Sequence, residues 1–255
     1  MDMIQPKISV VTVCYNAVKD IEKTILSVIN QTYPNIEYII IDGGSKDGTM
    51  DVVNKYKDKI DIIVSEPDKG IYDAMNKGID RATGEWINFM NAGDCFADNF
   101  VFDNIFKTVI SESISFIYSD LLKRNILGAY DVIKMECSSS ARKLVHQSVI
   151  YKRSLHQKYG YYIVTPKIIV SDYLFFLQVP LNEISKVNFY IAKYEGGGIS
   201  EQGDWCVKQS LCADVVFRYR SFWSLYIYYF IWRIKTWCPV KIRIWVKNIS
   251  KKIWN

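Results

Sequence analysis

The stretch that decides the fold is Gly84-Glu-Trp-Ile-Asn-Phe-Met-Asn-Ala-Gly-Asp94, an apolar segment that runs into a turn of small residues and ends on an acid. Trp86–Met90 is predicted to be a buried strand, so the carboxylate of Asp94 lies just beyond the end of that strand. A second apolar segment, Ile36–Ile41, passes in the same way into the acidic turn 42–49. Ligands of parallel α/β sheets bind outside the carboxyl ends of the strands. Two strand-end carboxylates therefore indicate a nucleotide site where a cation and a diphosphate meet.

Strands and helices are predicted to alternate around this stretch. Continuously apolar, β-branched segments are typical of strands buried on both faces, and apolar residues at helical spacing predict the helices between them. In chain order we expect strand Lys7–Cys14, a helix capped by Asn16 and stopped by Pro34, strand Ile36–Ile41, helix Thr49–Tyr56, strand Ile60–Ser65, helix Ile71–Arg81 and strand Trp86–Met90. This order at short spacing predicts an α/β fold with a mostly parallel sheet, right-handed crossovers and flanking helices.

Beyond about Ser113 the alternation becomes irregular. The pattern predicts strands at Phe116–Asp120, Ile126–Ile133, Val145–Tyr151 and Val187–Ala192, and an amphipathic helix at Ser171–Val179. The chain shows no internal repeat and no low-complexity linker. We therefore expect one domain over residues 1–204, followed by a helical extension over 205–255.

The composition is that of a folded globular protein and argues against several special classes. The chain has 255 residues, a net charge of +5 and 49% apolar residues. Its six cysteines form no Cys-x-x-Cys pair and only two histidines are present, which argues against a zinc site. The N-terminus has no secretory-signal pattern, so reduced thiols in a cytoplasmic protein are expected.

The C-terminal tail is rich in aromatic and basic residues. After Asp214 it holds nine Lys or Arg residues and no acid. Its most apolar segment, Phe222–Trp232, is shorter than the ~20 residues that a membrane-spanning helix needs. Basic segments rich in Trp and Tyr settle at the interface of anionic membranes. We expect this extension to lie on a membrane surface rather than on nucleic acid; the alternative is that its aromatic rings pack onto the preceding domain.

Three motifs occur in the order found in a known family. They are Ile8–Asn16 (ISVVTVCYN), Ile41–Thr49 (IDGGSKDGT) and Asn88–Asp94 (NFMNAGD), and together they resemble the family 2 glycosyltransferases. Ser65–Gly78 (SEPDKGIYDAMNKG) is similar to a branch of that family that builds bacterial surface polysaccharides. The resemblance is strong over residues 7–110 and weaker beyond them. It implies a fold of the GT-A type, with a mostly parallel, Rossmann-like sheet.

The resemblance also implies a nucleotide pocket near the first turns. Asp42 would accept hydrogen bonds from the base or ribose, and Thr12 and Tyr15 would line the base pocket. Asp68 would contact the base, and Lys69 the diphosphate. Each residue also has a plainer alternative: capping of its own turn for Asp42, a structural role for Thr12 and Tyr15, and a solvated turn for the other two.

At the Asn91–Asp94 turn the resemblance implies a divalent cation, Mn²⁺ or Mg²⁺, bound to Asp94 and to the diphosphate of the donor. The family usually carries two acids here, whereas Asn91, Ala92 and Gly93 leave a single carboxylate in this chain. Asn91 and Gly93 are expected to line the diphosphate site. The alternative is a simple tight turn.

The catalytic base is expected in the second half of the chain. Direct displacement at an anomeric carbon needs a carboxylate that takes the proton of the attacking hydroxyl. The family places it at the start of a helix, and Asp172 of Ser171-Asp172-Tyr173 fits that position, with Ser171 in place of the usual first acid. The alternative is an acid favoured by the helix dipole. His146 resembles a residue near the acceptor pocket, although a lone histidine is commonly structural.

By this resemblance the chain is an inverting glycosyltransferase. Residues 1–110 would bind a UDP-linked hexose, and 111–204 a polyprenyl-diphosphate-linked sugar at the inner face of the cell membrane. An α-linked donor would give a β-linkage in O-antigen, other lipopolysaccharide or capsule. Two alternatives remain: a sugar-phosphate nucleotidyltransferase, whose glycine-rich, arginine-containing loop is absent from Ile8–Asn16, and a non-catalytic membrane-associated partner.

Overall fold

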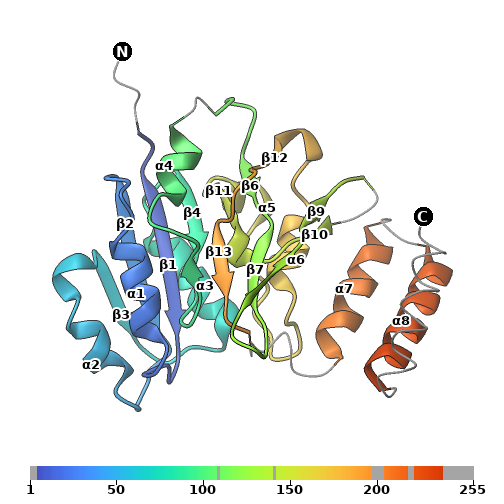
Figure 1. Ribbon diagram of the computed structural model, residues 1–255, viewed down its shortest axis with the longest axis horizontal. Coiled ribbons are helices and arrows are strands. Elements are labelled where there is room, and N and C mark those ends of the chain that lie inside the picture. Colours follow the sequence, from blue (N-terminus) through green and yellow to red (C-terminus); the bar gives the residue numbers. More distant parts are fainter. Residues whose placement is uncertain (1–4, 108–109, 140–141, 197–203, 218–220, 238–255) are drawn as a thin grey trace.

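A seven-stranded sheet forms the centre of the computed structural model, which describes residues 5–107, 110–139, 142–196, 204–217 and 221–237 (Figure 1). Its strands are β1 (Ile8–Cys14), β2 (Ile36–Asp42), β3 (Ile62–Ser65), β4 (Trp86–Phe89), β6 (Phe116–Tyr118), β11 (Val149–Lys152) and β12 (Ile184–Lys186). They lie in the order β12-β6-β11-β4-β1-β2-β3. β11 runs antiparallel to β4 and β6, whereas the other neighbouring pairs are parallel. The predicted α/β fold with a mostly parallel sheet is confirmed.

Two smaller sheets lie beside the central one. The strands β5 (Cys95–Phe96), β13 (Ala192–Tyr194), β7 (Leu121–Arg124) and β8 (Tyr130–Ile133) form one of them in this spatial order. The strands β9 (Glu136–Cys137) and β10 (Arg142–Lys143) pair with each other. β5 directly follows the Asn91–Asp94 turn. Its pairing with β13 therefore brings residues 192–194 next to that turn.

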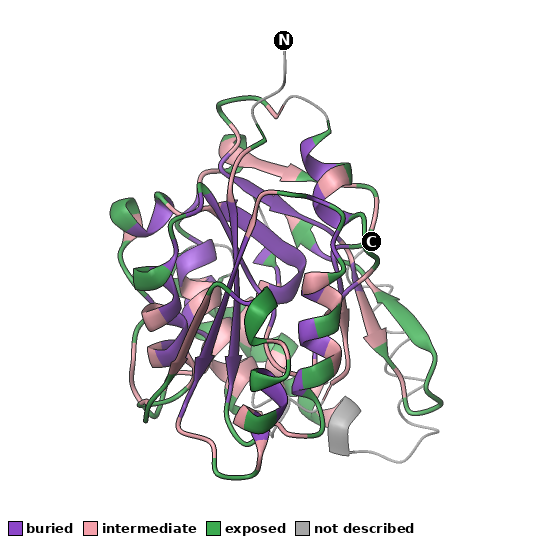
Figure 2. Cartoon of the chain, turned by 90° about the vertical axis from the view of Figure 1, so that its left-hand side faces the viewer, coloured by how far each residue is buried: buried purple, intermediate pink, exposed green. Residues whose placement is uncertain are grey.

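Helices lie on both faces of the central sheet (Figures 1 and 2). They are α1 (Ile21–Ile29), α2 (Thr49–Asn54), α3 (Ile71–Arg81), α4 (Val101–Phe106), α5 (Leu155–Tyr159) and α6 (Ser171–Phe176), with short 3-10 turns η1 (Lys57–Lys59), η2 (His146–Ser148) and η3 (Leu181–Glu183). Every residue of β1 is buried, and α1 buries Ile21, Ile25 and Val28 at helical spacing. Each fully buried aliphatic side chain contributes roughly 1.5–3 kcal/mol. The core therefore holds the parallel half rigidly beneath the polar turns at its edge.

Helices α7 (Trp205–Val216) and α8 (Phe222–Trp237) lie at the opposite end of the molecule from α2 and β3 (Figure 1). The N-terminal part of α7 is hydrogen-bonded to the segment before α6: Trp205 Nε1 donates to the carbonyl of Lys167 (2.8 Å) and Gln209 Oε1 accepts from Ile169 N–H (2.9 Å). Tyr229 of α8 donates to Asp204 Oδ2 (2.9 Å). A division of the chain between residues 204 and 205 stays a prediction.

No helix among the described residues is long and apolar enough to cross a membrane.

The helix at Ile71–Arg81 has the predicted bounds, and the predicted strands of the first half differ from the observed ones by at most two residues at an end. The predicted cap at Asn16 is wrong, because α1 begins at Ile21. Asn16 instead adopts a φ of +47° and accepts a hydrogen bond from Lys46 N–H through Oδ1 (3.0 Å). It therefore ties the first polar turn to the second.

Three strand predictions in the second half are wrong in part. The segment Ile126–Ile133 contains a turn closed by a hydrogen bond from Leu127 N–H to Asn125 Oδ1 (3.0 Å), and β7 and β8 form a hairpin around it. Val145–Tyr151 begins with η2, so that the strand starts only at Val149. Val187–Ala192 is mostly a connection between β12 and β13. Apolar runs of this length do not mark where a strand starts.

A buried polar cluster lies beneath α6. His156 is 5% exposed, its Nδ1 donates to the carbonyl of Gly160 (3.0 Å), and its Nε2 accepts from the hydroxyl of Tyr151 (2.8 Å). The ring stacks on Phe175 with 4.3 Å between centroids. Burial disfavours the imidazolium and lowers the pKa of His156 from 6.5 to about 4.

We expect the protein to lose stability as the pH falls from 6.5 towards 4. His156 takes up its proton at a higher pH in the unfolded chain than in the folded one, so its contribution is complete above 6.5 and declines below it. The loss between pH 7 and pH 5 should be roughly 2 kcal/mol in the free energy of unfolding. Urea titrations at several pH values measure it, with His156→Phe as the comparison.

The His156→Phe variant should show a shallower slope of stability against pH in this window, whatever its absolute stability. Glu37 and Asp120, whose pKa values are lowered to about 2 by hydrogen bonds that outweigh the effect of burial, act only at lower pH. Equal slopes for the two proteins would contradict the assignment.

Candidate active site

Polar turns follow β1, β2, β3 and β4 at the carboxyl edge of the sheet. The registers pair Cys14 with Asp42 and Asp42 with Ser65, so the last residues of β1, β2 and β3 lie level with one another. The backbone N–H of Ala92 donates to the carbonyl of Val13 (3.1 Å), which extends the pairing of β1 with the chain beyond β4. The turns predicted to carry the site therefore share one edge.

Asp42 is completely buried, and its carboxylate holds its own turn together. Oδ2 accepts from Gly44 N–H (3.1 Å), Ser45 N–H (3.0 Å) and the hydroxyl of Ser65 (2.6 Å), while Oδ1 accepts from the hydroxyl of Ser45. Burial opposes ionisation, but these hydrogen bonds outweigh it and keep the pKa of Asp42 below its ordinary value. The geometry favours the turn-capping alternative over direct contact with a nucleotide.

Thr12 and Tyr15 have opposite environments. Thr12 is completely buried within β1, and its hydroxyl pairs with that of Tyr38 (3.1 Å). This burial favours the structural alternative for Thr12, and its place in the base pocket stays a prediction. Tyr15 lies just beyond the strand and is 65% exposed, so its ring is available to a ligand.

The carboxylate of Asp68 and the ring of Tyr15 meet over Gly43. A Cβ atom on Gly43 would lie 2.4 Å from Asp68 Oδ2 and 3.3 Å from Tyr15 Cδ2, so only glycine leaves room for both side chains. Asp68 Oδ1 accepts from Gly70 N–H (2.8 Å). The side chain of Lys69 is exposed and has no hydrogen-bond or ion-pair partner in the described part of the chain. An aromatic face beside a carboxylate and a free ammonium group suits a nucleotide.

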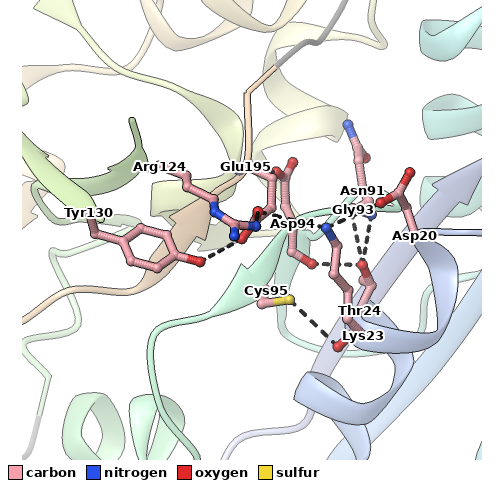
Figure 3. A network of polar contacts seen from close by, with 10 residues as sticks. All are labelled: Asp20, Lys23, Thr24, Asn91, Gly93, Asp94, Cys95, Arg124, Tyr130 and Glu195. Atoms are coloured by element: carbon pink, nitrogen blue, oxygen red, sulfur yellow. Dashed lines mark hydrogen bonds and ion pairs between the residues drawn. The ribbon is translucent and has the colours of Figure 1, made fainter. Parts of the chain in front are cut away.

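The Asn91–Asp94 turn is held from α1. Gly93 has a φ of +105°, a left-handed conformation that favours glycine, and its N–H donates to the hydroxyl of Thr24 (2.9 Å). The same hydroxyl donates to the carbonyl of Asp94 (2.7 Å). Asn91 and Gly93 thus shape the turn, and its backbone is fixed before any ligand binds (Figure 3).

The carboxylate of Asp94 faces the second half of the chain. Oδ2 accepts from Gln147 Nε2 (2.7 Å) and Oδ1 from Glu195 N–H (3.3 Å). Burial raises the pKa of Asp94, although the hydrogen bond from Gln147 opposes the rise. Glu195 is itself fixed by Arg124 Nη1 (2.8 Å) and by the hydroxyl of Tyr130, as Figure 3 shows. The sheet β5-β13-β7-β8 therefore supports Asp94 from the side opposite α1.

The turn offers two oxygen donors to a cation. One is the carboxylate of Asp94, and the other is Asn91 Oδ1, a buried oxygen that has no hydrogen-bond partner among the described residues. No cluster of three or more His, Cys, Asp or Glu side chains suited to a metal occurs in the described ranges. Mg²⁺ commonly uses one or two protein ligands and completes its shell with phosphate oxygens and water. The residues present fit such a cation, held jointly with a diphosphate.

Asp172 lies in the first turn of α6 and receives hydrogen bonds from three donors. The hydroxyl of Tyr72 donates to Oδ1 (2.8 Å), as does Tyr173 N–H (2.9 Å), and His146 Nδ1 lies 3.0 Å from Oδ2. Burial opposes ionisation, but the contacts with His146 and Tyr72 outweigh it and hold the pKa of Asp172 below its ordinary value. The carboxylate is therefore ionised at neutral pH and able to accept a proton.

Two consecutive residues connect Asp172 to the Asn91–Asp94 turn. His146 Nε2 lies 2.8 Å from Asn91 Nδ2, while its Nδ1 contacts Asp172. Gln147 donates to Asp94. The two acids predicted for the metal and the base, 78 residues apart in the chain (172 − 94), therefore meet at one site.

The sequence predicts no role in the site for Tyr72, which lies within the motif Ser65–Gly78, or for Gln147. Gln147 had a usable signal, because it directly follows His146 in the chain. Glu195 had no such signal in the sequence, because it donates to Asp94 through its backbone N–H, a group that every residue except proline carries.

Comparisons with known proteins match this chain to glycosyltransferases. Residues 9–110 match the model of glycosyl transferase family 2. A PGL/p-HBAD biosynthesis glycosyltransferase of Mycobacterium tuberculosis is 28% identical over 210 residues, which cover 78% of this chain and 80% of that protein. The putative teichuronic acid biosynthesis glycosyltransferase TuaG of Bacillus subtilis is 38% identical over 93 residues, which cover 35% of this chain and 37% of that protein.

Solved structures show the same fold. TarS 1–349 of S. aureus in complex with UDP superposes with a TM-score of 0.67 at 19% identity; the match covers 83% of this chain but 65% of that one. The mannosyltransferase PcManGT of Pyrobaculum calidifontis, in complex with GDP-Man and Mn²⁺, superposes with a TM-score of 0.66 at 13% identity over 99% of this chain and 82% of that one. The fold of this chain is of the GT-A type.

We expect Asp42→Asn to destabilise the fold, because one amide oxygen and one NH₂ group would replace two acceptors that face only donors. An unmatched buried group of this kind costs about 2–4 kcal/mol. Urea denaturation measures the change, with Asp51→Asn, an exposed acid on α2, as the control. A stable Asp42→Asn protein that binds nucleotide poorly would instead favour direct contact with the nucleotide.

Proposed function

We propose, from the match of residues 9–110 to the model of glycosyl transferase family 2, that this chain transfers a hexose from a UDP-linked sugar to a hydroxyl of a lipid-diphosphate-linked saccharide, with inversion at the anomeric carbon. The observation that carries the proposal is the meeting of Asp94 and Asp172 through His146 and Gln147. One acid is placed for the leaving diphosphate and the other for the attacking hydroxyl.

The donor would bind across the first three polar turns. The exposed ring of Tyr15 offers a stacking surface to the base, and Asp68 beside it offers an acceptor for an N–H or hydroxyl of the nucleoside. The ammonium of Lys69, which has no partner within the described ranges, suits the diphosphate. Asp42 would support this pocket indirectly, by shaping the backbone at Gly43 and Gly44. Solved neighbours in complex with UDP and with GDP-Man support a nucleotide-sugar donor.

Asp94 and Asn91 Oδ1 would hold Mn²⁺ or Mg²⁺ together with the diphosphate. A bound divalent cation neutralises negative charge that develops on the leaving diphosphate. The chain's own contribution is to keep the Asp94 carboxylate in place, through Gln147 on one oxygen and Glu195 N–H on the other. A cation beside this carboxylate favours its ionised form, against the rise in pKa that burial causes.

Asp172 would act as the base. Its low pKa keeps it ionised before the reaction, and its position beside His146 places it near the diphosphate turn. In a single displacement the hydroxyl attacks from the side opposite the diphosphate, so that an α-linked donor gives a β-linkage. The chain's likeness to glycosyltransferases of surface-polymer pathways supports a role in surface polysaccharide synthesis, such as that of O-antigen or capsule.

The acceptor's lipid would be reached through α8. This helix exposes Phe222 (62%), Trp223 (74%), Tyr226 (63%) and Phe230 (61%), and the chain after Asp214 carries basic residues and no acid. Aromatic rings settle at the membrane interface, and basic side chains are attracted to anionic headgroups. The proposed location is therefore peripheral, on the inner face of the cell membrane.

Asp172→Asn should abolish transfer and leave donor binding intact. Loss of a general base costs about 10²–10⁴-fold in kcat. The assay screens UDP-glucose, UDP-galactose and UDP-N-acetylhexosamines with a synthetic diphosphate-lipid acceptor and Mn²⁺, while calorimetry measures the Kd of the donor.

Asp58→Asn, at an exposed position in η1, is the matched control and should behave as the wild type. Turnover that Asp172→Asn leaves unchanged would remove Asp172 from its role. A wild-type protein that binds the donor but transfers nothing would favour the non-catalytic partner, and formation of a nucleotide sugar from a sugar phosphate and a nucleotide would favour the nucleotidyltransferase.

We expect the protein to sediment with vesicles that contain anionic phospholipid and less with purely zwitterionic ones. Binding should weaken as salt rises, because screening reduces the attraction of basic residues to headgroups. The double variant Phe222→Ser/Trp223→Ser should lose most of the binding. Phe100→Ser, at a 53% exposed ring before α4, should retain it. Equal binding of both variants would contradict docking through α8.

A further inference from the structure

The two oxygens of the Asp172 carboxylate have different numbers of donors. Oδ1 accepts two hydrogen bonds, from the hydroxyl of Tyr72 (2.8 Å) and from Tyr173 N–H (2.9 Å). Oδ2 has a single donor among the described residues, His146 Nδ1 at 3.0 Å. Each carboxylate oxygen has two lone pairs. The lone pair that remains for a substrate therefore belongs to Oδ2.

The neighbours of His146 determine where its proton lies. The amide nitrogen of Asn91, 2.8 Å from Nε2, has hydrogens to donate and no lone pair to offer, so Nε2 is the acceptor. Asp172, being ionised, only accepts, so Nδ1 carries the hydrogen. The two contacts thus place a hydrogen on Nδ1 and leave Nε2 as the acceptor. In this form His146 donates to Asp172 and takes no proton from it.

We propose that Oδ2 of Asp172 is the atom that receives the proton of the acceptor hydroxyl, and that Tyr72 and His146 are positioning residues that orient this oxygen. The inference rests on the proposed function. As the hydroxyl oxygen forms its bond to the anomeric carbon, its O–H bond breaks and the proton passes to Oδ2. The bond from the anomeric carbon to the diphosphate breaks, and its electron pair leaves with the diphosphate.

Three separate elements hold the carboxylate in this orientation. Tyr72 comes from α3, His146 from η2, and Tyr173 N–H from α6 itself. Asp172 and His146 are each 16% exposed, so solvent competes little with these bonds. His146 is fixed in turn by Asn91 of the donor turn. The direction of the base is therefore set relative to the same turn that carries Asp94.

Among the described residues, titratable side chains from the surrounding elements lie near Asp172. They are Tyr72 of α3, His146 of η2, Tyr151 of β11, Tyr162 before α6 and Cys206 of α7. Burial raises the pKa of the three tyrosines and of the thiol. These four groups stay neutral at the pH where Asp172 titrates. Asp94 also titrates in the acidic limb, but Tyr72 donates to Asp172. A shift of the limb that follows substitution of Tyr72 therefore reports on Asp172.

Nitrogen-15 NMR of the histidines tests the tautomer without any turnover. The chain has two histidines, so a histidine-labelled sample gives two ring spin systems. His156 is an internal reference, since its Nδ1 donates to the carbonyl of Gly160. Substitution of His146 identifies the signals. A hydrogen on Nδ1 of His146 together with a bare Nε2 supports the inference; a bare Nδ1, or a hydrogen on Nε2, overturns it.

Kinetics test the role of Tyr72. Tyr72→Phe removes a donor to the ionised carboxylate, so the pKa of Asp172 should rise and the acidic limb of kcat against pH should move up by about one pH unit. Tyr161→Phe is the matched control, because it also removes a hydrogen bond from a tyrosine to a carboxylate, that of the exposed residue Asp80. An acidic limb that moves no further in Tyr72→Phe than in Tyr161→Phe overturns the role of Tyr72.

Variants of His146 distinguish a role in orienting Asp172 from a role in the stability of the fold. The amide of His146→Asn can take the place of the Nδ1–H donor, whereas His146→Ala cannot. We expect His146→Ala to lose at least ~10-fold in kcat with little change in donor KM, and His146→Asn to recover most of the loss. Equal kcat values for the two variants overturn the positioning role. A wild type without transfer activity refutes the proposed function instead, and the NMR result then decides the state of His146 alone.

Discussion

The reversed direction of β11 is the constraint on which the site depends. β11 pairs with β4 in antiparallel register, Tyr151 opposite Ile87 and Lys152 opposite Trp86. The beginning of β11 therefore lies where β4 ends, and η2 immediately before it arrives beside the Asn91–Asp94 turn. A parallel strand in this place would begin at the opposite edge of the sheet, and the residues before it would lie far from the Asn91–Asp94 turn. One reversed strand thus carries His146 and Gln147 to the two acids.

Asp42, Asp94 and Asp172 differ in pKa because different numbers of donors contact their carboxylates. Asp42 is buried but saturated with donors from its own turn, which makes it part of the scaffold. Asp94 is nearly as buried and has fewer donors, so burial prevails and its pKa rises. Asp172 has donors enough to stay ionised, and one lone pair to spare. Scaffold, cation site and base are thus distinguished by hydrogen bonding rather than by residue type.

The first half of the fold was predictable because parallel strands are buried on both faces. Such strands are continuous apolar runs, and β1 and β2 were recognisable from the β-branched residues alone. The roles of individual side chains at strand ends were harder to predict. Thr12 and Tyr15 are three residues apart, yet one is sealed in the core and the other is 65% exposed, because the strand ends between them.

The second half was less predictable because its contacts are distant in sequence and its strands are short. The strand β6 and the start of α6 were found, but the hairpin of β7 and β8 was not. Asp172 was recognisable from its place before an aromatic run, whereas its donors Tyr72 and His146 lie 100 and 26 residues away. No local pattern predicts such pairs, since tertiary packing alone brings them together.

The side-chain amide of Asn91 links the Asn91–Asp94 turn, which carries a single acid, to the proposed base Asp172. Asn91 donates to His146 Nε2, and this leaves a ring hydrogen on Nδ1, directed at Asp172. An aspartate at position 91 would accept instead, so Nε2 would need a proton of its own and the ring would become an imidazolium between two carboxylates. That charge would stabilise ionised Asp172 further and weaken it as a base. Oδ1 of the same asparagine has no hydrogen-bond partner among the described residues, so it is available as a ligand for a cation. A neutral residue at this position therefore serves the base on one side and the cation on the other.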